Sequence, residues 1–377
     1  MCIALPPYPF YSEFGEMLLD VLAHLGFRPT VVQDGDRAVL AADVLLLIGT
    51  GLCFTGCAQL LSHWQGQRPT TILWQTEPFP PPTLSPLAER RGLQAVATTQ
   101  IVRLPAWVLK LLKSVIAPPA LIRVREAIRS TFFFRFRQEM ITSDPQLALT
   151  ELAASVWWWP MCQYAWLKQH FPQGWLDFVC TASVSGEQFL TGRDIPARFV
   201  PVGYHVRMGI DLAKERDIDV LFIGQLWHPR RKAILDTLQR SLTLKGIKMV
   251  IVGDECYGEQ RTELLNRARI SLNVCHYPWD LPGLRFLMSM GCGALVVSEL
   301  LSDVIPYEAG KHFVQAEIAA LPDTICYYLE HPHECQTMTR AAFQLVTREM
   351  TLQKAVAEVM KEVAEDCPGK KGNLNTR

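Results

Sequence analysis

The sequence has no excess of charge of either sign, because 37 lysines and arginines balance 37 aspartates and glutamates among 377 residues. A protein dedicated to nucleic-acid binding normally carries a basic surplus, so no nucleic-acid partner is predicted. The 11 cysteines are scattered without any CxxC pair, which argues against a zinc site or a disulfide framework and for reduced thiols in the cytoplasm. Residues 1–12 lack a basic segment followed by a long apolar run, so no signal peptide is predicted.

A long, purely apolar helix is also missing. The uncharged stretch 44–62 contains Gly49, Gly51 and Gly56, so a buried strand, a glycine loop and a helix explain it better than a membrane span. With 49% hydrophobic and 20% charged residues, the chain is too apolar to be disordered over most of its length. Its length favours two domains.

Short apolar runs alternate with longer helical stretches, which is typical of βαβ units and parallel sheets. Buried strands are predicted at 2–5, 30–32, 44–48, 71–74, 95–98, 178–181, 220–223, 248–252, 270–274 and 294–297. We therefore expect an α/β protein of two doubly wound domains, residues 1–203 and 204–365, that meet near Pro201 and Gly203. The polar tail 366–377 is expected to fray.

The interval 101–137 combines eight basic residues and one acid with many apolar and aromatic side chains. Such a segment can bind the anionic inner face of a membrane. It can equally be a helical insertion that packs on the sheet and leaves its charges in water. Both interpretations stay open for a protein that is expected to be cytoplasmic.

The first candidate motif, at 219–235, reads DVLFIGQLWHPRRKAIL. A strand is predicted to end at Gly224, where the missing side chain lets the backbone approach a ligand. The helix that follows opens with Arg230 and Arg231, so its free amides and these cations suit a diphosphate. The alternative is that both arginines are surface residues at a helix start.

The second motif, at 271–299, places His276, Tyr277 and Asp280 in a loop after a strand. A helix is then predicted to begin at Gly283 and Leu284, whose backbone amides would face an anion, with Arg285 one turn inside. Asp280 can accept hydrogen bonds from sugar hydroxyls, whereas His276 on its own fits a structural histidine as well as a functional one.

Residues 219–360 resemble the C-terminal domain of GT-B glycosyltransferases, in particular the CgeB-type (spore-maturation-protein-like) branch of the family 1/family 4-like enzymes. The segments that carry the resemblance are DVLFIG followed by RR, LLNRARISLNV, GLRFLMSMGCGALVVSE, PYEAGKHFV and LPDTICYYLEHPHE, in the family's order.

The resemblance implies two Rossmann-like domains that face each other across a cleft, with a nucleotide-sugar donor held mainly by the second domain. It also implies that the last helix, 351–365, packs back on the first domain. Two acidic residues with seven between them contact the donor in the family. Asp280 matches the first, but Met288 stands at the second position and cannot accept hydrogen bonds as a carboxylate does.

The first half offers fewer candidates. Glu13 lies at a predicted helix start and Glu77 at the end of a predicted strand, where open α/β sheets bind ligands. Either carboxylate could act as a catalytic base, and either could instead be a helix cap or an ion-pair partner. The tryptophans at 157–159 and Trp166 suit an acceptor platform, or simply packing against the sheet.

These observations lead to the hypothesis of a glycosyltransferase that moves a sugar from a nucleoside-diphosphate donor to an unidentified acceptor. No metal site and no bound cofactor are predicted. Met288 motivates the alternative of a catalytically impaired protein that binds nucleotide sugars. The segment 101–137 motivates the alternative of a scaffold at the membrane periphery.

Overall fold

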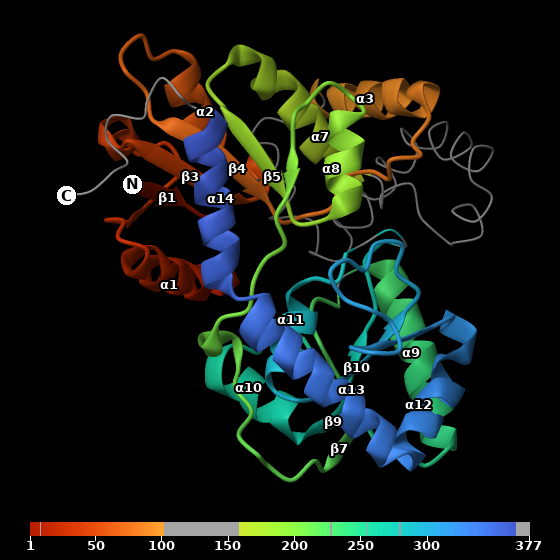
Figure 1. Cartoon of the computed structure of the whole chain (residues 1–377). Coiled ribbons are helices and arrows are strands. Elements are labelled where there is room, and N and C mark those ends of the chain that lie inside the picture. Colours follow the sequence, from red (N-terminus) through yellow and green to blue (C-terminus); the bar gives the residue numbers. More distant parts are fainter. Residues whose placement is uncertain are drawn as a thin grey trace, which may run out of the picture.

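The computed structural model describes residues 1–7, 9–101, 158–226, 228–253, 255–277, 279 and 281–366 of the chain. It contains two parallel sheets, one built from the first half of the chain and one from the second (Figure 1). The predicted segment 101–137 lies outside the described residues apart from Ile101, as does the tail from 367 onward, so both expectations stay predictions.

The first sheet has six parallel strands in the order β2-β1-β3-β4-β5-β6. Its strands are β1 (Cys2–Ala4), β2 (Thr30–Val32), β3 (Val44–Gly49), β4 (Thr70–Gln75), β5 (Phe178–Thr181) and β6 (Arg198–Phe199). The central strands β3 and β4 are buried along their whole length, as expected where helices cover both faces of a parallel sheet.

Helices α1 (Pro9–His24) and α14 (Leu352–Asp366) pack on one face of this sheet. The other face is covered by α2 (Thr55–Ser62), α3 (Pro86–Ile101), α7 (Trp158–His170) and α8 (Val184–Thr191). Short helical turns lie at η1 (Arg37–Ala41), η2 (Gly51–Cys53) and η4 (Phe171–Gln173). The strand predicted at 95–98 is wrong, because these residues form part of α3.

The second sheet has five parallel strands in the order β11-β10-β9-β7-β8. The strands are β7 (Ile218–Ile223), β8 (Met249–Val252), β9 (Ala268–Asn273), β10 (Leu295–Glu299) and β11 (Val314–Ala316). Since β7 and β9 are neighbours while β8 lies outside them, the order of strands reverses between β7 and β9. Ligands of open α/β sheets bind at such a switch point, beyond the carboxyl ends of the strands.

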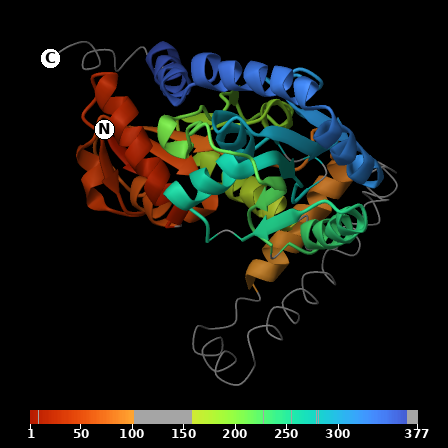
Figure 2. The same ribbon diagram turned by 90° about the horizontal axis from the view of Figure 1, so that it is seen from below.

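On one face of this sheet lie α9 (Pro229–Leu244) and α12 (Leu321–Glu330). On the other lie α10 (Gly258–Arg267) and α11 (Leu284–Gly291). The remaining elements are η5 (Val206–Met208), η6 (Ile318–Ala320), α13 (Pro332–Gln344) and the π-helical turn η7 (Leu345–Glu349). The last helices run along one side of the molecule and across both domains (Figure 2).

The chain crosses between the domains twice, and the two crossings are bonded to each other. The Tyr204 backbone N–H donates to the Met350 carbonyl, and the Leu352 N–H donates to the Tyr204 carbonyl, both at 2.7 Å. Gly203 lies so close that an added Cβ would come within 2.3 Å of the Thr351 carbonyl carbon, so only glycine fits there.

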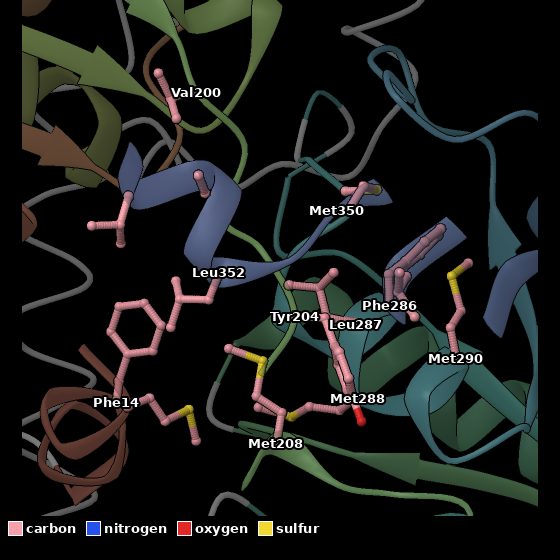
Figure 3. Packing of buried hydrophobic residues seen from close by; sticks show 14 of the residues in the cluster. Phe14, Val200, Tyr204, Met208, Phe286, Leu287, Met288, Met290, Met350 and Leu352 are labelled. Atoms are coloured by element: carbon pink, nitrogen blue, oxygen red, sulfur yellow. The ribbon is translucent and has the colours of Figure 1, made fainter. Parts of the chain in front are cut away.

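One apolar cluster extends from the first sheet through this crossing into α11 (Figure 3). Phe14 of α1 and Leu352 of α14 contribute to it from the first domain's side, while Tyr204, Met208 and Phe286 contribute from the crossing and the second domain. The two domains are therefore joined by a shared core as well as by chain connections. No described helix is both long enough and apolar enough to cross a membrane.

Candidate functional site

Charged and aromatic side chains gather at the carboxyl ends of β7, β9 and β10, at the switch point of the second sheet. Gly224 follows β7 directly, His276 and Tyr277 follow β9, and Glu299 is the last residue of β10. The carboxyl ends of parallel strands share one edge of a sheet, so the fold brings these residues together although they lie far apart in sequence.

Gly224 and Arg285 are in direct contact. The Arg285 Nε donates to the Ile223 carbonyl at 2.9 Å, and its Nη1 donates to the Asn273 side-chain oxygen. Gly224 has φ +150°, and a Cβ added there would come within 2.6 Å of the Arg285 Nη2. The glycine is therefore needed both for its backbone conformation and for the approach of the guanidinium.

The start of α11 lies beside this contact. Gly283 is its N-cap residue and has no side chain that could cap the first backbone N–H groups of α11. Among the described residues, a Cβ added at Gly283 would meet no heavy atom within 4 Å. The amides of Leu284 and Arg285 thus begin a helix whose N-terminus is flanked by open space, an arrangement that favours an anion.

Arg230 is held by a buried carboxylate. Its guanidinium donates two hydrogen bonds to Glu299, one at 3.0 Å, and a third to the Cys275 carbonyl at 3.0 Å. Glu299 also accepts from the Cys275 N–H at 2.6 Å, and the side chains of the ion pair are 7% and 4% exposed. The charge of Arg230 is therefore balanced within the protein.

Arg231 is buried beside this pair, with 5% of its surface exposed. Its Nη1 donates to the Gln225 carbonyl at 3.2 Å, and its guanidinium lies 5.6 Å from the centre of the Phe222 ring. Arg285 lies over the same ring at 4.7 Å. Phe222 of β7 thus supports two guanidinium groups at once through cation–π contact.

Two histidines share the cluster. The rings of His228 and His276 are 5.0 Å apart, and Tyr277 lies 5.7 Å from His228. Burial lowers the pKa of His228 to about 4, and the charges of Arg231 and Arg230 add to this effect. Burial and the neighbouring Arg231 also lower the pKa of His276. Both imidazoles are neutral at pH 7, so the positive charge of the cluster comes from its arginines.

The loop after β9 reaches the first domain. Tyr277 and Trp279 are 4% and 5% exposed and pack in the apolar cluster beneath α3, α7 and α8. The Trp279 indole N–H donates to the backbone carbonyl of Phe79 at 3.0 Å. Phe79 lies two residues after Glu77, so this contact joins the edges of the two sheets.

The two candidate bases belong to the first domain. Glu77 is half-buried after β4, where its backbone carbonyl accepts from the Gln75 Nε2 at 3.1 Å. Glu13 of α1 forms a double hydrogen bond with Arg261 of α10, at 2.8 and 2.9 Å. The ion-pair role that the sequence left open for Glu13 is therefore the one that the geometry displays.

The remaining candidates are dispersed. Met288 packs in the apolar cluster beside Tyr204 and Met208 (Figure 3). Asp280 lies outside the described residues, as does residue 157 of the tryptophan group. Trp166 is buried in the first domain, where its ring lies 5.9 Å from that of Trp175 and closes over Gly51.

The sequence reasoning missed Glu299, His228 and Trp279. Glu299 had a usable signal, because it lies two residues after the predicted strand 294–297, at the carboxyl edge where open α/β sheets bind ligands. Trp279 had none, because its hydrogen bond is made to the other domain. No group of three or more potential metal ligands occurs in the part of the chain that the structure describes.

Comparison with known proteins agrees with this arrangement. Residues 230–361 match the family model described as glycosyl transferase-like. The crystal structure of a glycosyltransferase from Rickettsia africae is similar at a TM-score of 0.55, with 10% identity, over 97% of this chain and 98% of that one. The predicted GT-B fold, two Rossmann-like sheets in one chain, is thereby confirmed.

Two other structures are more distant. Anabaena HepE, crystallised with UDP and glucose, aligns over 97% of this chain and 100% of its own at 11% identity and a TM-score of 0.48. TarM aligns over 49% of this chain at 11% identity and a TM-score of 0.41, and the match spans 43% of TarM. No curated protein matches the sequence.

Proposed function

We propose, from the premise that residues 230–361 form a glycosyl transferase-like domain within a GT-B fold, that the chain transfers a sugar from a nucleoside-diphosphate donor to an acceptor. The observation that carries the proposal is the meeting of Gly224, the buried arginines and the start of α11 at the switch point of the second sheet. A combination of cations and helix N-terminal amides suits a diphosphate leaving group.

We assign Arg230 a different role from Arg231 and Arg285. Glu299 balances Arg230, so we assign Arg230 to fixing the loop after β9 through the Cys275 carbonyl. Arg231 donates to the Gln225 carbonyl, and Arg285 donates to the Ile223 carbonyl and to the Asn273 side-chain oxygen, so both guanidinium groups are held at the carboxyl ends of the strands. Their two charges match the two negative charges of an esterified diphosphate, and they stabilise the charge that builds up as the glycosidic bond breaks.

The helix start complements the arginines. Amides at Leu284 and Arg285 supply uncharged donors from a fixed backbone, which need no reorganisation during the reaction. The neutral histidines leave the site without further charge at pH 7. Asp280 retains its proposed role as an acceptor of hydrogen bonds from the donor sugar, and Glu77 its proposed role as a base at the edge of the first sheet.

A second function follows from Met288. At the position where the family has its second carboxylate, this chain has a thioether that packs among apolar side chains. A protein that binds the donor and turns it over slowly or not at all would have the same arginine cluster. Nucleotide binding without release of sugar would identify that function.

The test is calorimetric binding of UDP, GDP and dTDP, followed by hydrolysis assays with the corresponding nucleotide sugars. Replacing Arg231 by alanine is expected to weaken the binding of the preferred nucleotide by roughly 10- to 100-fold, the worth of a charge-assisted hydrogen bond. Arg240, an exposed residue of the same helix, provides the matched control Arg240→Ala, which should bind as the unaltered protein does. Equal affinity of the two variants would refute the assigned role.

A further inference from the structure

The loop after β9 lies in the second half of the chain, but its side chains Tyr277 and Trp279 insert into the apolar cluster of the first domain. Tyr277 and Trp279 are almost completely buried, and their apolar neighbours include Phe79, Leu84 and Phe189 of the first domain. Burial of two large aromatic rings across a domain boundary stabilises the contact, because it removes much apolar surface from water. This insertion is therefore a principal contact between the domains.

The inserted Trp279 side chain is held by a hydrogen bond to a backbone atom. The Trp279 indole donates to the Phe79 carbonyl at 3.0 Å, and the Phe79 ring stacks on Phe189 of α8 at 6.0 Å. A buried indole N–H without an acceptor is costly, so the hydrogen bond fixes the depth and the direction of the insertion.

A line of aromatic rings leads back to the arginine cluster. Trp279 stacks on Tyr277 at 5.4 Å with an interplanar angle of 23°, and Tyr277 lies 5.7 Å from His228 and 6.0 Å from His276. His228 immediately precedes α9, which begins with Pro229 and Arg230. The position of Trp279 against the first domain thus determines where the rings beside the arginines lie.

A second contact joins the same edges of the two sheets. Asp303, which follows β10, accepts from the Ser185 backbone N–H at 2.9 Å and from its hydroxyl at 3.2 Å. Ser185 lies in the first turn of α8, after β5. The ends of β9 and β10 therefore contact the ends of β4 and β5 at two points, and the Ser185 amide reports on whether the edges stay together.

We infer that Trp279 is a positioning residue that couples the docking of the two domains to the geometry of the arginine cluster. The inference rests on the proposed function, because it assigns Trp279 an effect on nucleotide binding although the residue contacts the first domain. Loss of the indole N–H loosens the insertion, and the loop that carries His276 and precedes α11 then loses its fixed position.

The experiment compares Trp279→Phe with Trp175→Phe. Trp175 is 1% exposed in the first domain, and its indole nitrogen has no hydrogen-bond partner in the structure. Both variants lose the same atoms from a buried site, but only Trp279→Phe loses a hydrogen bond between the domains. The readouts are the hydrogen-exchange rate of the Ser185 amide and the dissociation constant of UDP, or of whichever nucleotide the unaltered protein prefers.

For Trp279→Phe we expect the Ser185 amide to exchange roughly two- to tenfold faster and the nucleotide to bind weaker by a similar factor, the range that follows from one intramolecular hydrogen bond. Trp175→Phe should change neither. Unchanged exchange at Ser185, or faster exchange with unaltered affinity, would overturn the coupling while leaving the proposed function intact. If the unaltered protein binds no nucleotide, the proposed function falls and the coupling falls with it.

Discussion

Arg261 offers the sharpest test of how the two domains hold together. It lies on α10 of the second domain with 3% of its side chain exposed, and it donates to both oxygens of Glu13 on α1 of the first domain. The same guanidinium donates to the carbonyl of Met208, in the first crossing between the domains, at 3.2 Å. The substitution Arg261→Ala removes all these bonds together.

The magnitude follows from the burial of the pair. Removing one partner of a fully buried ion pair costs about 3–5 kcal/mol, because the other charge is left without compensation. Glu13 keeps 21% of its side chain exposed, so water solvates part of the abandoned carboxylate and the lower end of the range applies. We expect a loss of about 3 kcal/mol, which corresponds to a fall in Tm of about 4 °C at an unfolding entropy of roughly 2.1 cal/mol/K per residue.

A second ion pair between the same regions serves as the control. Arg207 of η5 contacts Glu16 of α1 at 2.9 Å, but the two side chains are 50% and 66% exposed. Exposed pairs contribute about 0–1 kcal/mol and are screened by salt. Denaturation in guanidinium chloride or urea, with thermal unfolding at low and high salt, should show a large salt-insensitive loss for Arg261→Ala and a small loss for Arg207→Ala.

Equal losses in the two variants would refute the reasoning from burial. The same series also decides the role of Glu13. As an ion-pair partner, Glu13→Gln should lower stability and leave turnover of a nucleotide sugar nearly unchanged. Turnover abolished at unaltered stability would instead restore Glu13 as the catalytic base.

Two further predictions concern the arginine cluster. The substitution Glu299→Gln leaves the charge of Arg230 unbalanced in a buried site, so the free energy of unfolding should fall by about 3 kcal/mol. Added pyrophosphate should then raise the Tm of the variant more than that of the unaltered protein. Equal shifts in Tm would contradict this account. Because burial lowers the pKa of His228 from 6.5 to about 4, the unfolded chain takes up a proton first as the pH falls below about 6.5. His228 alone should therefore lower the stability by about 2 kcal/mol between pH 7 and pH 5, as chemical denaturation would show. Replacing His228 by asparagine should remove this share of the loss, whereas replacing the exposed His63 by glutamine should not.

The sequence was sufficient to predict most of the strands and the fold. Runs such as 44–48 and 220–223 are apolar throughout, as strands buried on both faces must be, and their order along the chain favours parallel sheets. The run at 95–98 misled because a short apolar stretch fits a strand and a buried helix equally well. The residues on either side of this run are helical as well, and together they form α3.

The meeting of Gly224 with the start of α11 could be anticipated, because both follow strands of one parallel sheet. The partners of individual side chains could not. Arg230 pairs with a residue 69 positions away, Trp279 with one 200 positions away, and Arg261 with one 248 positions away. Such pairings depend on how loops and domains pack, and neither local propensity nor periodicity carries that information.

The two chain crossings that pair at Tyr204 and Thr351 fix where the domains meet. Two backbone segments, each connecting the two domains, are bonded to each other at this point and hold the domains together. Gly203 lets the two segments come close enough to form these hydrogen bonds. A bulkier residue at position 203 would collide with the Thr351 backbone, so the two segments would separate and the domains would lose this connection.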